Sequence, residues 1–264
     1  MESRADDWTA EHEVGTGLGP RNRISEVARQ AVLDAAAVLQ VRRSEVAAMA
    51  ARGKAQDVVI IGRSAGEVNG WMKASSPEWR ELLSVRPAAT STQLRVTLPH
   101  NRTLVADGLR MVSIFDADGL ELDARLLLAS EPAGQYRFSV APVQMKIVDR
   151  RYVLLQGPVI DGVASVMAVS SGPCLEAAWR YWHASLGSSF PALEGVGTLS
   201  DLTPRQRQVV ALMATGIGDE AIAASLEVSV RTVRSDVAAL LDLLGVKTRF
   251  AAGIRLQLWS GAWD

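Results

Sequence analysis

Residues 201–264 read DLTPRQRQVVALMATGIGDEAIAASLEVSVRTVRSDVAALLDLLGVKTRFAAGIRLQLWSGAWD, and this stretch decides the fold of the C-terminal part of the chain. Thr203 stands one residue before a proline and three before Gln206, which is typical of a capped helix start. Apolar residues then recur at helical spacing up to a glycine. The same pattern predicts a second helix over 219–226 and a third over 229–244.

The third predicted helix has an apolar and a polar face. Its apolar residues recur in steps of three and four, so the residues between them must point away from the core. Two helices joined by a tight turn, the second with Arg and Ser near its start, have the geometry that enters a DNA major groove. The outward-facing residues are Arg231, Arg234, Ser235 and Ala238.

Residues 202–263 resemble the LuxR-type helix-turn-helix domain. LTPRQRQVVALMATG is similar to its opening, EAIAASLEVSVRTVRSDV to its scanning and recognition helices, and LGVKTRFAAG to its closing helix. The resemblance implies a cytoplasmic transcription regulator that binds inverted half-sites on double-stranded DNA as a homodimer, with RNA polymerase as a further candidate partner.

The resemblance also implies roles for particular residues. Arg234 and Ser235 match positions that contact base edges, where arginine pairs with guanine. Ser229 lies at the cap of the third helix, and the Ala238 methyl can touch a thymine methyl. The positions expected near phosphates are Arg231, Thr232, Lys247, Thr248 and Arg249.

Several residues depart from the family pattern. Glu227 replaces a turn glycine, Ala221 a frequent glutamate, Asp236 a frequent histidine and Leu243 a frequent lysine, so we expect modest affinity. The net charge of −1 does not by itself predict a nucleic-acid partner. Basic residues in 199–264 are balanced by as many acidic ones, and a local patch must therefore supply the attraction to DNA.

A final helix is predicted to carry Phe250, Ile254, Leu258 and Trp259 along one side. In LuxR-like proteins this helix commonly carries the dimer contact of the DNA-binding domain. The alternative is that these residues close the core of their own domain.

Residues 24–187 predict an α/β domain that senses a ligand or holds a dimer. The stretch 24–51 is rich in helix-forming residues and predicts an unusually long helix. Continuous apolar runs then favour strands covered on both faces. These runs are DVVIIG at 57–62, QLRVTLP at 93–99, YRFSVAPV at 136–143, MKIVD at 145–149, YVLLQG at 152–157 and VASVMAVS at 163–170; helices are expected over 75–85 and 172–186.

The segments on either side of this domain lack such patterns. Residues 1–23 show no periodicity and predict a mobile tail. Residues 188–198 are rich in Gly, Ser and Pro, which is typical of an interdomain linker. The DNA-binding domain is therefore expected to occupy 199–264.

The segment VAPVQMKIVDRRYVLLQGP at 140–158 resembles the core of the phospholipase-D-like sensor domains of TrmB-like regulators. There a strand ending in Asp is followed by a short turn, a second strand and a glycine. Enzymes of that family place a His-x-Lys pair before the Asp, whereas Pro142 and Gln144 occupy those positions here. Proline offers no ring nitrogen to attack phosphorus, so we expect no catalytic residue. The alternative is a phosphodiesterase-like enzyme with a helical appendage.

Polar residues near predicted strand ends are candidates for binding an anionic small-molecule effector. The alternative is that Arg102 pairs with a surface carboxylate and the domain binds no ligand but only holds a dimer. The candidates are His100, Arg102, Gln144 and Lys146.

Composition excludes several other classes. One cysteine and three dispersed histidines predict no disulfide and no metal site, and no cofactor is expected. No apolar run is long enough to cross a membrane, and the acidic start lacks the features of a secretory signal. We therefore expect no membrane partner and a cytoplasmic location.

Overall fold

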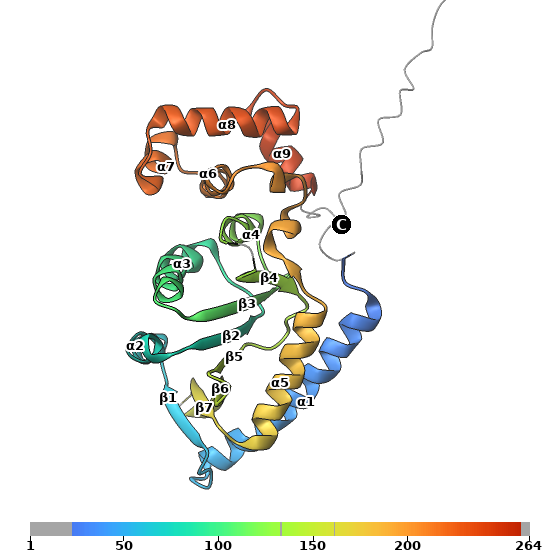
Figure 1. Cartoon of the computed structure of the whole chain (residues 1–264), viewed down its shortest axis with the longest axis vertical. Helices are drawn as coiled ribbons and strands as arrows, with labels where there is room; N and C mark the ends of the chain where they lie inside the picture. The colour runs from blue at the N-terminus through green and yellow to red at the C-terminus, as the bar shows by residue number, and fades with distance from the viewer. Residues whose placement is uncertain (1–22, 133, 161, 260–264) are drawn as a thin grey trace, which may run out of the picture.

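The computed structural model describes residues 23–132, 134–160 and 162–259, and the predicted tail over 1–23 lies almost entirely outside them. The chain forms an α/β region, from α1 to the 3-10 segment η3, followed by a helical region of α6 to α9 (Figure 1). The strands are β1 Val58–Gly62, β2 Glu81–Arg86, β3 Arg110–Asp116, β4 Tyr136–Ser139, β5 Met145–Val148, β6 Tyr152–Ile160, β7 Val163–Val169 and β8 Phe190–Pro191. The helices of the α/β region are α1 Glu26–Ala51, α2 Ala65–Ser75, α3 Ser91–Ala106, α4 Leu122–Ala129 and α5 Gly172–Gly187, with short 3-10 segments η2 Ser76–Glu78 and η3 Ala192–Asp201.

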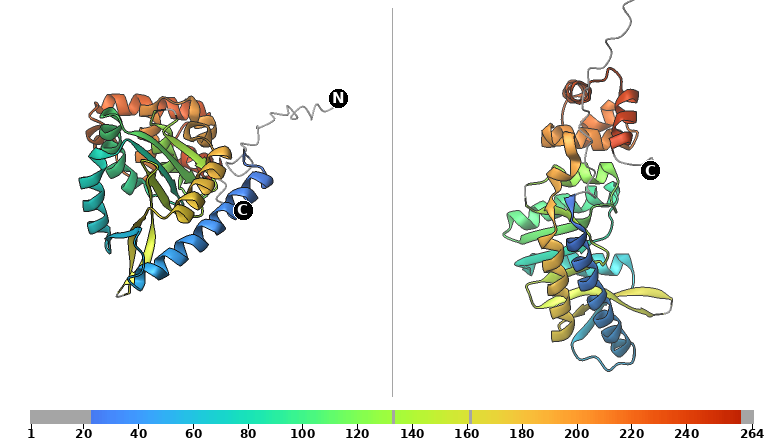
Figure 2. Two further views of the ribbon diagram at one scale, coloured as in Figure 1. Left: turned by 60° about the horizontal axis from the view of Figure 1, so that its bottom comes forward. Right: turned by 90° about the vertical axis from the view of Figure 1, so that its right-hand side faces the viewer.

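In the described part of the chain, the eight strands form one mixed sheet with the order β1-β7-β6-β5-β2-β3-β4-β8. Strands β2, β3 and β4 are parallel, and the other pairs are antiparallel. Helices α2, α3 and α4 cover one face, while α1 and α5 lie side by side on the other (Figures 1 and 2). The prediction of a sheet covered on both faces is confirmed.

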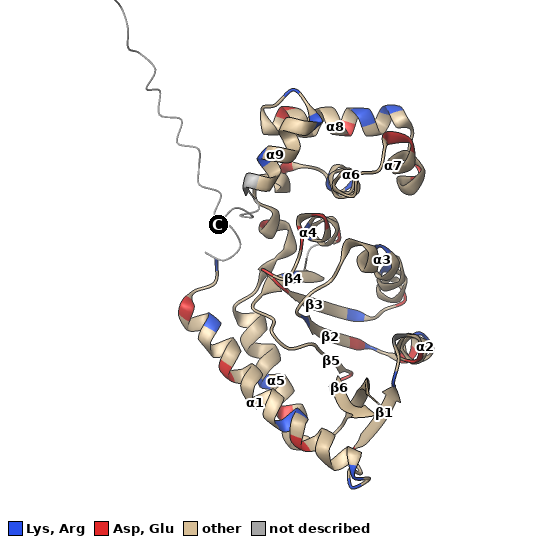
Figure 3. Ribbon diagram, turned by 180° about the vertical axis from the view of Figure 1, so that it is seen from behind, with Lys and Arg blue, Asp and Glu red and all other residues tan. Residues whose placement is uncertain are grey.

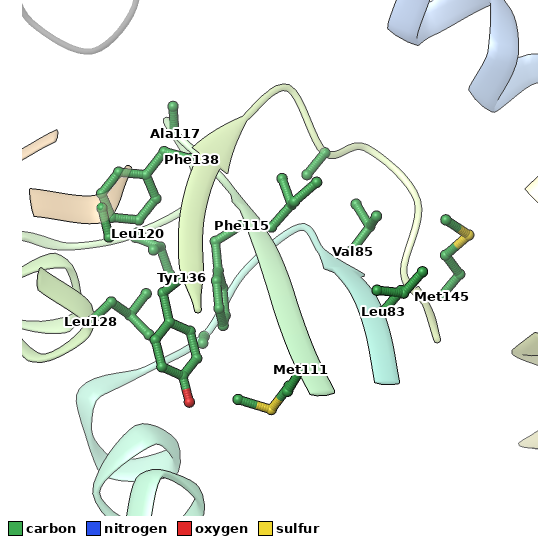
Figure 4. Packing of buried hydrophobic residues seen from close by; sticks show 14 of the residues in the cluster. Leu83, Val85, Met111, Phe115, Ala117, Leu120, Leu128, Tyr136, Phe138 and Met145 are labelled. Carbon is green, nitrogen blue, oxygen red and sulfur yellow. The ribbon is translucent and has the colours of Figure 1, made fainter. Parts of the chain in front are cut away.

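The core fills the space between the sheet and its helices. Figure 4 shows side chains from β2, β3, β4 and β5 packed beside one another, among them Phe115, Tyr136 and Met145. Phe138 is fully buried and meets Phe190 of β8 edge-on, with ring centroids 6.0 Å apart. Burial of such large side chains is worth roughly 1.5–3 kcal/mol each.

Two predicted elements were wrong. Residues 93–99 form the first half of α3 and no strand, because Thr90 and Gln93 make a reciprocal capping box that starts a helix there. Residues 81–86 form the central strand β2, not a helix, since their side chains are buried between the helix layers and pair with β3 and β5. Strand β3 was not predicted at all.

The stretch 188–198, predicted to be a linker, is packed against the sheet. Its strand β8 pairs with β4, and η3 follows directly. Gly195 lies so close to Phe138 that a Cβ placed on it would be 2.2 Å from the ring. This connection between the two regions is therefore part of the fold.

The helical region comprises α6 Pro204–Ala214, α7 Asp219–Leu226, α8 Val230–Leu244 and α9 Arg249–Trp259. It contacts the α/β region through α6, which packs on α4. A cavity of about 580 Å³ lies at this junction and is lined by Leu122 and Asp123 of α4 and by Met213, Arg249 and Leu256. Within the described part of the chain, no helix has the length and apolarity needed to cross a membrane.

Candidate nucleic-acid interface

Side-chain caps fix the starts of the helices that build this interface. The Thr203 hydroxyl accepts a hydrogen bond from the Gln206 backbone N–H, and the Gln206 side-chain oxygen accepts one from the Thr203 N–H. Ser229 caps α8 by accepting from the Thr232 N–H at 3.0 Å. Both caps lie where the sequence pattern places them.

A small apolar cluster holds α6, α7 and α8 together. Val209 and Leu212 from α6 and Ile222 from α7 meet Val233 and Val237 from α8, and all five are buried. These contacts fix the rotation of α8 about its axis. As a result, Arg231, Arg234, Ser235 and Ala238 lie on its exposed side.

The exposed side of α8 points away from the α/β region. Helix α6 lies between α8 and α4 in Figure 1. Figure 3 shows basic positions on α8 at the end next to α7, and others in the turn before α9. That turn holds Lys247 and Thr248, both exposed, and leads to Arg249. The predicted DNA-contacting residues therefore lie at the two ends of one exposed surface.

Asp219 joins the two ends of this surface. Its Oδ1 accepts from Arg249 at 2.7 Å, and its Oδ2 lies 3.5 Å from the Nε of Arg234. The Asp219 side chain is only 13% exposed, while those of both arginines are much more so. Asp219 therefore orients two residues that are predicted to contact DNA, and no pattern in the sequence indicates this role.

Asp236, which departs from the family pattern, has a structural partner. Its carboxylate is buried and accepts from Arg205 of α6 at 2.8 and 3.2 Å. The hydrogen bonds and charge of Asp236 raise the pKa of Arg205. This pair ties α6 to α8, so neither residue counts in the charge of the exposed surface.

Arg207 is also unavailable to a ligand. Its side chain is buried, and it donates to the backbone carbonyls of Ser200 and Leu202. Burial lowers the pKa of its guanidinium. Arg207 therefore anchors the end of η3 to α6.

Helix α9 has an exposed apolar side, as a dimer contact requires, and a buried side, as closing the core of its own domain requires. Phe250 is 79% exposed and Ile254 49%, whereas Ala252 is buried against the core. The side chains of Leu258 and Trp259 lie outside the described residues. An exposed apolar side is thus present on a helix that also closes its own domain.

The four predicted ligand-binding residues do not come together. His100 and Arg102 lie on α3, not at a strand end, and Arg102 forms a two-pronged ion pair with the buried carboxylate of Glu131. Gln144 and Lys146 instead line a separate cavity of about 410 Å³ beside α2. The sequence misplaced His100 and Arg102 because it assigned 93–99 to a strand.

The helical region is similar to a known protein family. Residues 200–255 match the family model described as bacterial regulatory proteins, luxR family. No curated protein and no solved structure matches the chain. The match covers α6, α7, α8 and the first part of α9, which are the elements that build the exposed surface.

Proposed function

We propose that this chain is a transcription regulator that contacts bases with α8, because residues 200–255 match the luxR family of bacterial regulatory proteins. The observation that carries the proposal is the exposed side of α8, where Arg234 and Ser235 stand clear of the α/β region. Arg234 pairs with a guanine through its O6 and N7 atoms. Ser235 and the Ala238 methyl contact neighbouring bases.

The remaining predicted contacts position the protein on the DNA backbone. Arg231 and Thr232 lie in the first turn of α8, where the helix dipole also favours phosphate. Lys247, Thr248 and Arg249 reach phosphates at the other end of the surface. Because these cations are few, each subunit neutralises few phosphates and a second subunit supplies the rest.

The proposal includes a homodimer on a palindromic operator. One α8 covers a single half-site, whereas a two-fold dimer presents two such helices about one helical turn apart. Phe250 and Ile254 lie on the exposed side of α9 and would form the apolar centre of a two-fold contact between the α9 helices of the two subunits.

The α/β region is proposed to act as a sensor, without catalysis, of the phospholipase-D-like type. Strand β5 ends at Val148, Asp149 begins the tight turn that follows, and β6 contains Gly157. Asp149 accepts hydrogen bonds from the backbone N–H groups of Arg80 and Glu81, both at 2.8 Å. Its carboxylate is thus engaged in holding β2 in place, which favours a structural role over chemistry.

Selection from a random pool of duplex DNA by the full chain tests this proposal. We expect enrichment of an inverted repeat with half-site centres about 10 base pairs apart. Ala238→Asp places a carboxylate against the bases and is expected to abolish enrichment, because the position is exposed and its change leaves the fold intact. Ala88→Asp, at an exposed alanine of the α/β region, is the matched control. Failure of the wild-type chain to enrich any sequence would contradict the proposal.

A further inference from the structure

The cavity of about 410 Å³ has the size of a small-molecule site. It opens where β2 ends and β5 begins, next to Pro87, Gln144 and Lys146. Sheets that contain parallel strands commonly bind ligands outside the carboxyl ends of those strands. The remaining lining comes from α2, from the β6–β7 hairpin and from α1, which contributes Arg43.

The charges that line this cavity are positive. Its lining includes Arg43 and Lys146 but no aspartate or glutamate. Arg43 donates to the side-chain oxygen of Gln40 at 2.6 Å and to the backbone carbonyl of Gln156 at 3.3 Å, which are both neutral acceptors. Among the ion pairs found in the described part of the chain, none involves Arg43 or Lys146.

Lys146 is held in surroundings that disfavour its charge. Burial in the first place, and the nearby Arg86 guanidinium in the second, lower the pKa of its ammonium group to about 8. Arg86 itself lies over the Phe115 ring, 5.3 Å from its centroid. An anion in the cavity would offset both the desolvation of Lys146 and its repulsion from Arg86.

The rest of the lining accepts an apolar group. Val68 and Met72 project from α2, and Leu154 and Val166 come from β6 and β7. Gln40, Gln144 and Gln156 add neutral hydrogen-bonding groups at the rim. Two cations beside an apolar wall fit an amphipathic anion better than a sugar or an inorganic ion.

We propose that this cavity binds a small organic acid, whose carboxylate lies between Arg43 and Lys146 and whose apolar body packs on Val68, Met72 and Leu154. The inference rests on the proposed sensor role of the α/β region. It replaces His100 and Arg102 of the sequence-based set with Arg43 and keeps Gln144 and Lys146.

Calorimetric titration and thermal unfolding of the full chain test this site. The probes are butanoate, hexanoate, octanoate and benzoate, with 1-hexanol and hexylamine as neutral and cationic counterparts. We expect at least one carboxylate to bind and to raise the melting temperature, and the alcohol and amine to bind at least about tenfold more weakly, since a charge-assisted hydrogen bond is lost. Absence of binding by all four acids, or equal binding of hexanol and hexanoate, overturns the proposal.

Substitutions place the acid in this cavity. Lys146→Gln and Arg43→Gln are each expected to weaken carboxylate binding by about tenfold or more. Lys73→Gln, which removes an exposed positive charge from α2 outside the lining, is the matched control and keeps wild-type affinity. Should Arg43→Gln fail to fold, Lys146→Gln decides, because loss of a partly buried charge does not impair folding. Unchanged affinity in Lys146→Gln overturns the assignment.

Titration with a selected DNA duplex separates this inference from the proposed function. Carboxylate binding that shifts DNA affinity supports both. Carboxylate binding by a chain that binds no specific DNA contradicts the proposed function and still supports the site. Specific DNA binding by a chain that binds none of the acids leaves the proposed function standing and overturns the site.

Discussion

Glu227 adopts a backbone conformation that suits glycine better. It ends α7 in the left-handed region, with φ of 56° and ψ of 40°. A residue with a Cβ is destabilised by about 1–2 kcal/mol in this conformation. A carboxylate at the C-terminal end of a helix adds an unfavourable interaction with the helix dipole. The turn between α7 and α8 is therefore strained in this chain.

Glu227→Gly is expected to raise the free energy of unfolding by about 1 kcal/mol, measured by urea denaturation. Glu227→Ala removes the same charge but keeps the Cβ, so its gain should be clearly smaller. Equal gains in the two variants would mean that charge, and not backbone strain, dominates at this turn.

Lys146 carries a cost in stability that depends on pH. The pKa of its ammonium group is about 8 in the folded chain against an ordinary value of 10.5, so the unfolded chain binds the proton more tightly. Below pH 8 the full cost of burying the charge is present. As pH rises from 8 to 10.5, the folded state has already released its proton, and the cost is progressively removed.

Lys146→Met should accordingly stabilise the ligand-free chain by roughly 2–3 kcal/mol at pH 7, and the difference should shrink toward pH 10.5. Urea denaturation at a series of pH values measures this. A stability difference that is constant over that range would show that the charge of Lys146 is not what destabilises the fold.

Most of the exposed side of α8 was predictable from the sequence, but the ion-pair partners of its residues were not. The apolar steps from Val233 to Leu244 fix which side of the helix is buried, and the outward position of Arg234 follows from them. The contacts of Asp219 with Arg234 and Arg249, and of Asp236 with Arg205, join residues from different helices. Periodicity along one element contains no information about such neighbours.

Among the elements, some segments contain residues that favour a strand and residues that start a helix, and the helix caps decide which of the two forms. The residues of 93–99 include valine, threonine and leucine, which also suit a strand, yet the capping box at Thr90 starts a helix. Strand β2 was taken for a helix because Pro77 follows a serine, whereas that signal produces only the 3-10 segment η2. The helices α1, α5 and α8 were predicted correctly, because each is long enough for the helical spacing of its apolar residues to repeat over several turns.

The segment η3 offers a direct test of whether the connection between the two regions is packed. Gly195→Ala would bring a Cβ within 2.2 Å of the Phe138 ring and force the two apart. We expect a loss of roughly 1–3 kcal/mol, seen as a lower melting temperature. Gly187→Ala, where a Cβ meets no atom within 4 Å, is the control. Equal behaviour of the two variants would indicate a loose linker, as the composition alone suggested.

In the whole molecule, the packing of the helical region leaves the exposed side of α8, which is proposed to contact DNA, free of the α/β region. Contact runs through α6 and α4, and α8 lies on the far side of that contact (Figure 1). A regulator built in this way can engage DNA without releasing the α/β region. The cavity proposed for an organic acid is lined by the sheet, α1 and α2, so any effect on DNA must pass through these elements, through α4 or through a dimer contact.

The base preference of Arg234→Ala tests directly whether α8 reads the DNA sequence. The wild-type chain and the variant are titrated by fluorescence anisotropy against the selected duplex and against its single-base changes. We expect the variant to lose about 1–3 kcal/mol of binding free energy on the selected duplex and to lose its preference at one base pair in each half-site. Unchanged affinity, or a uniform loss that leaves every base preference intact, would contradict the assignment of α8 as the helix that reads the sequence.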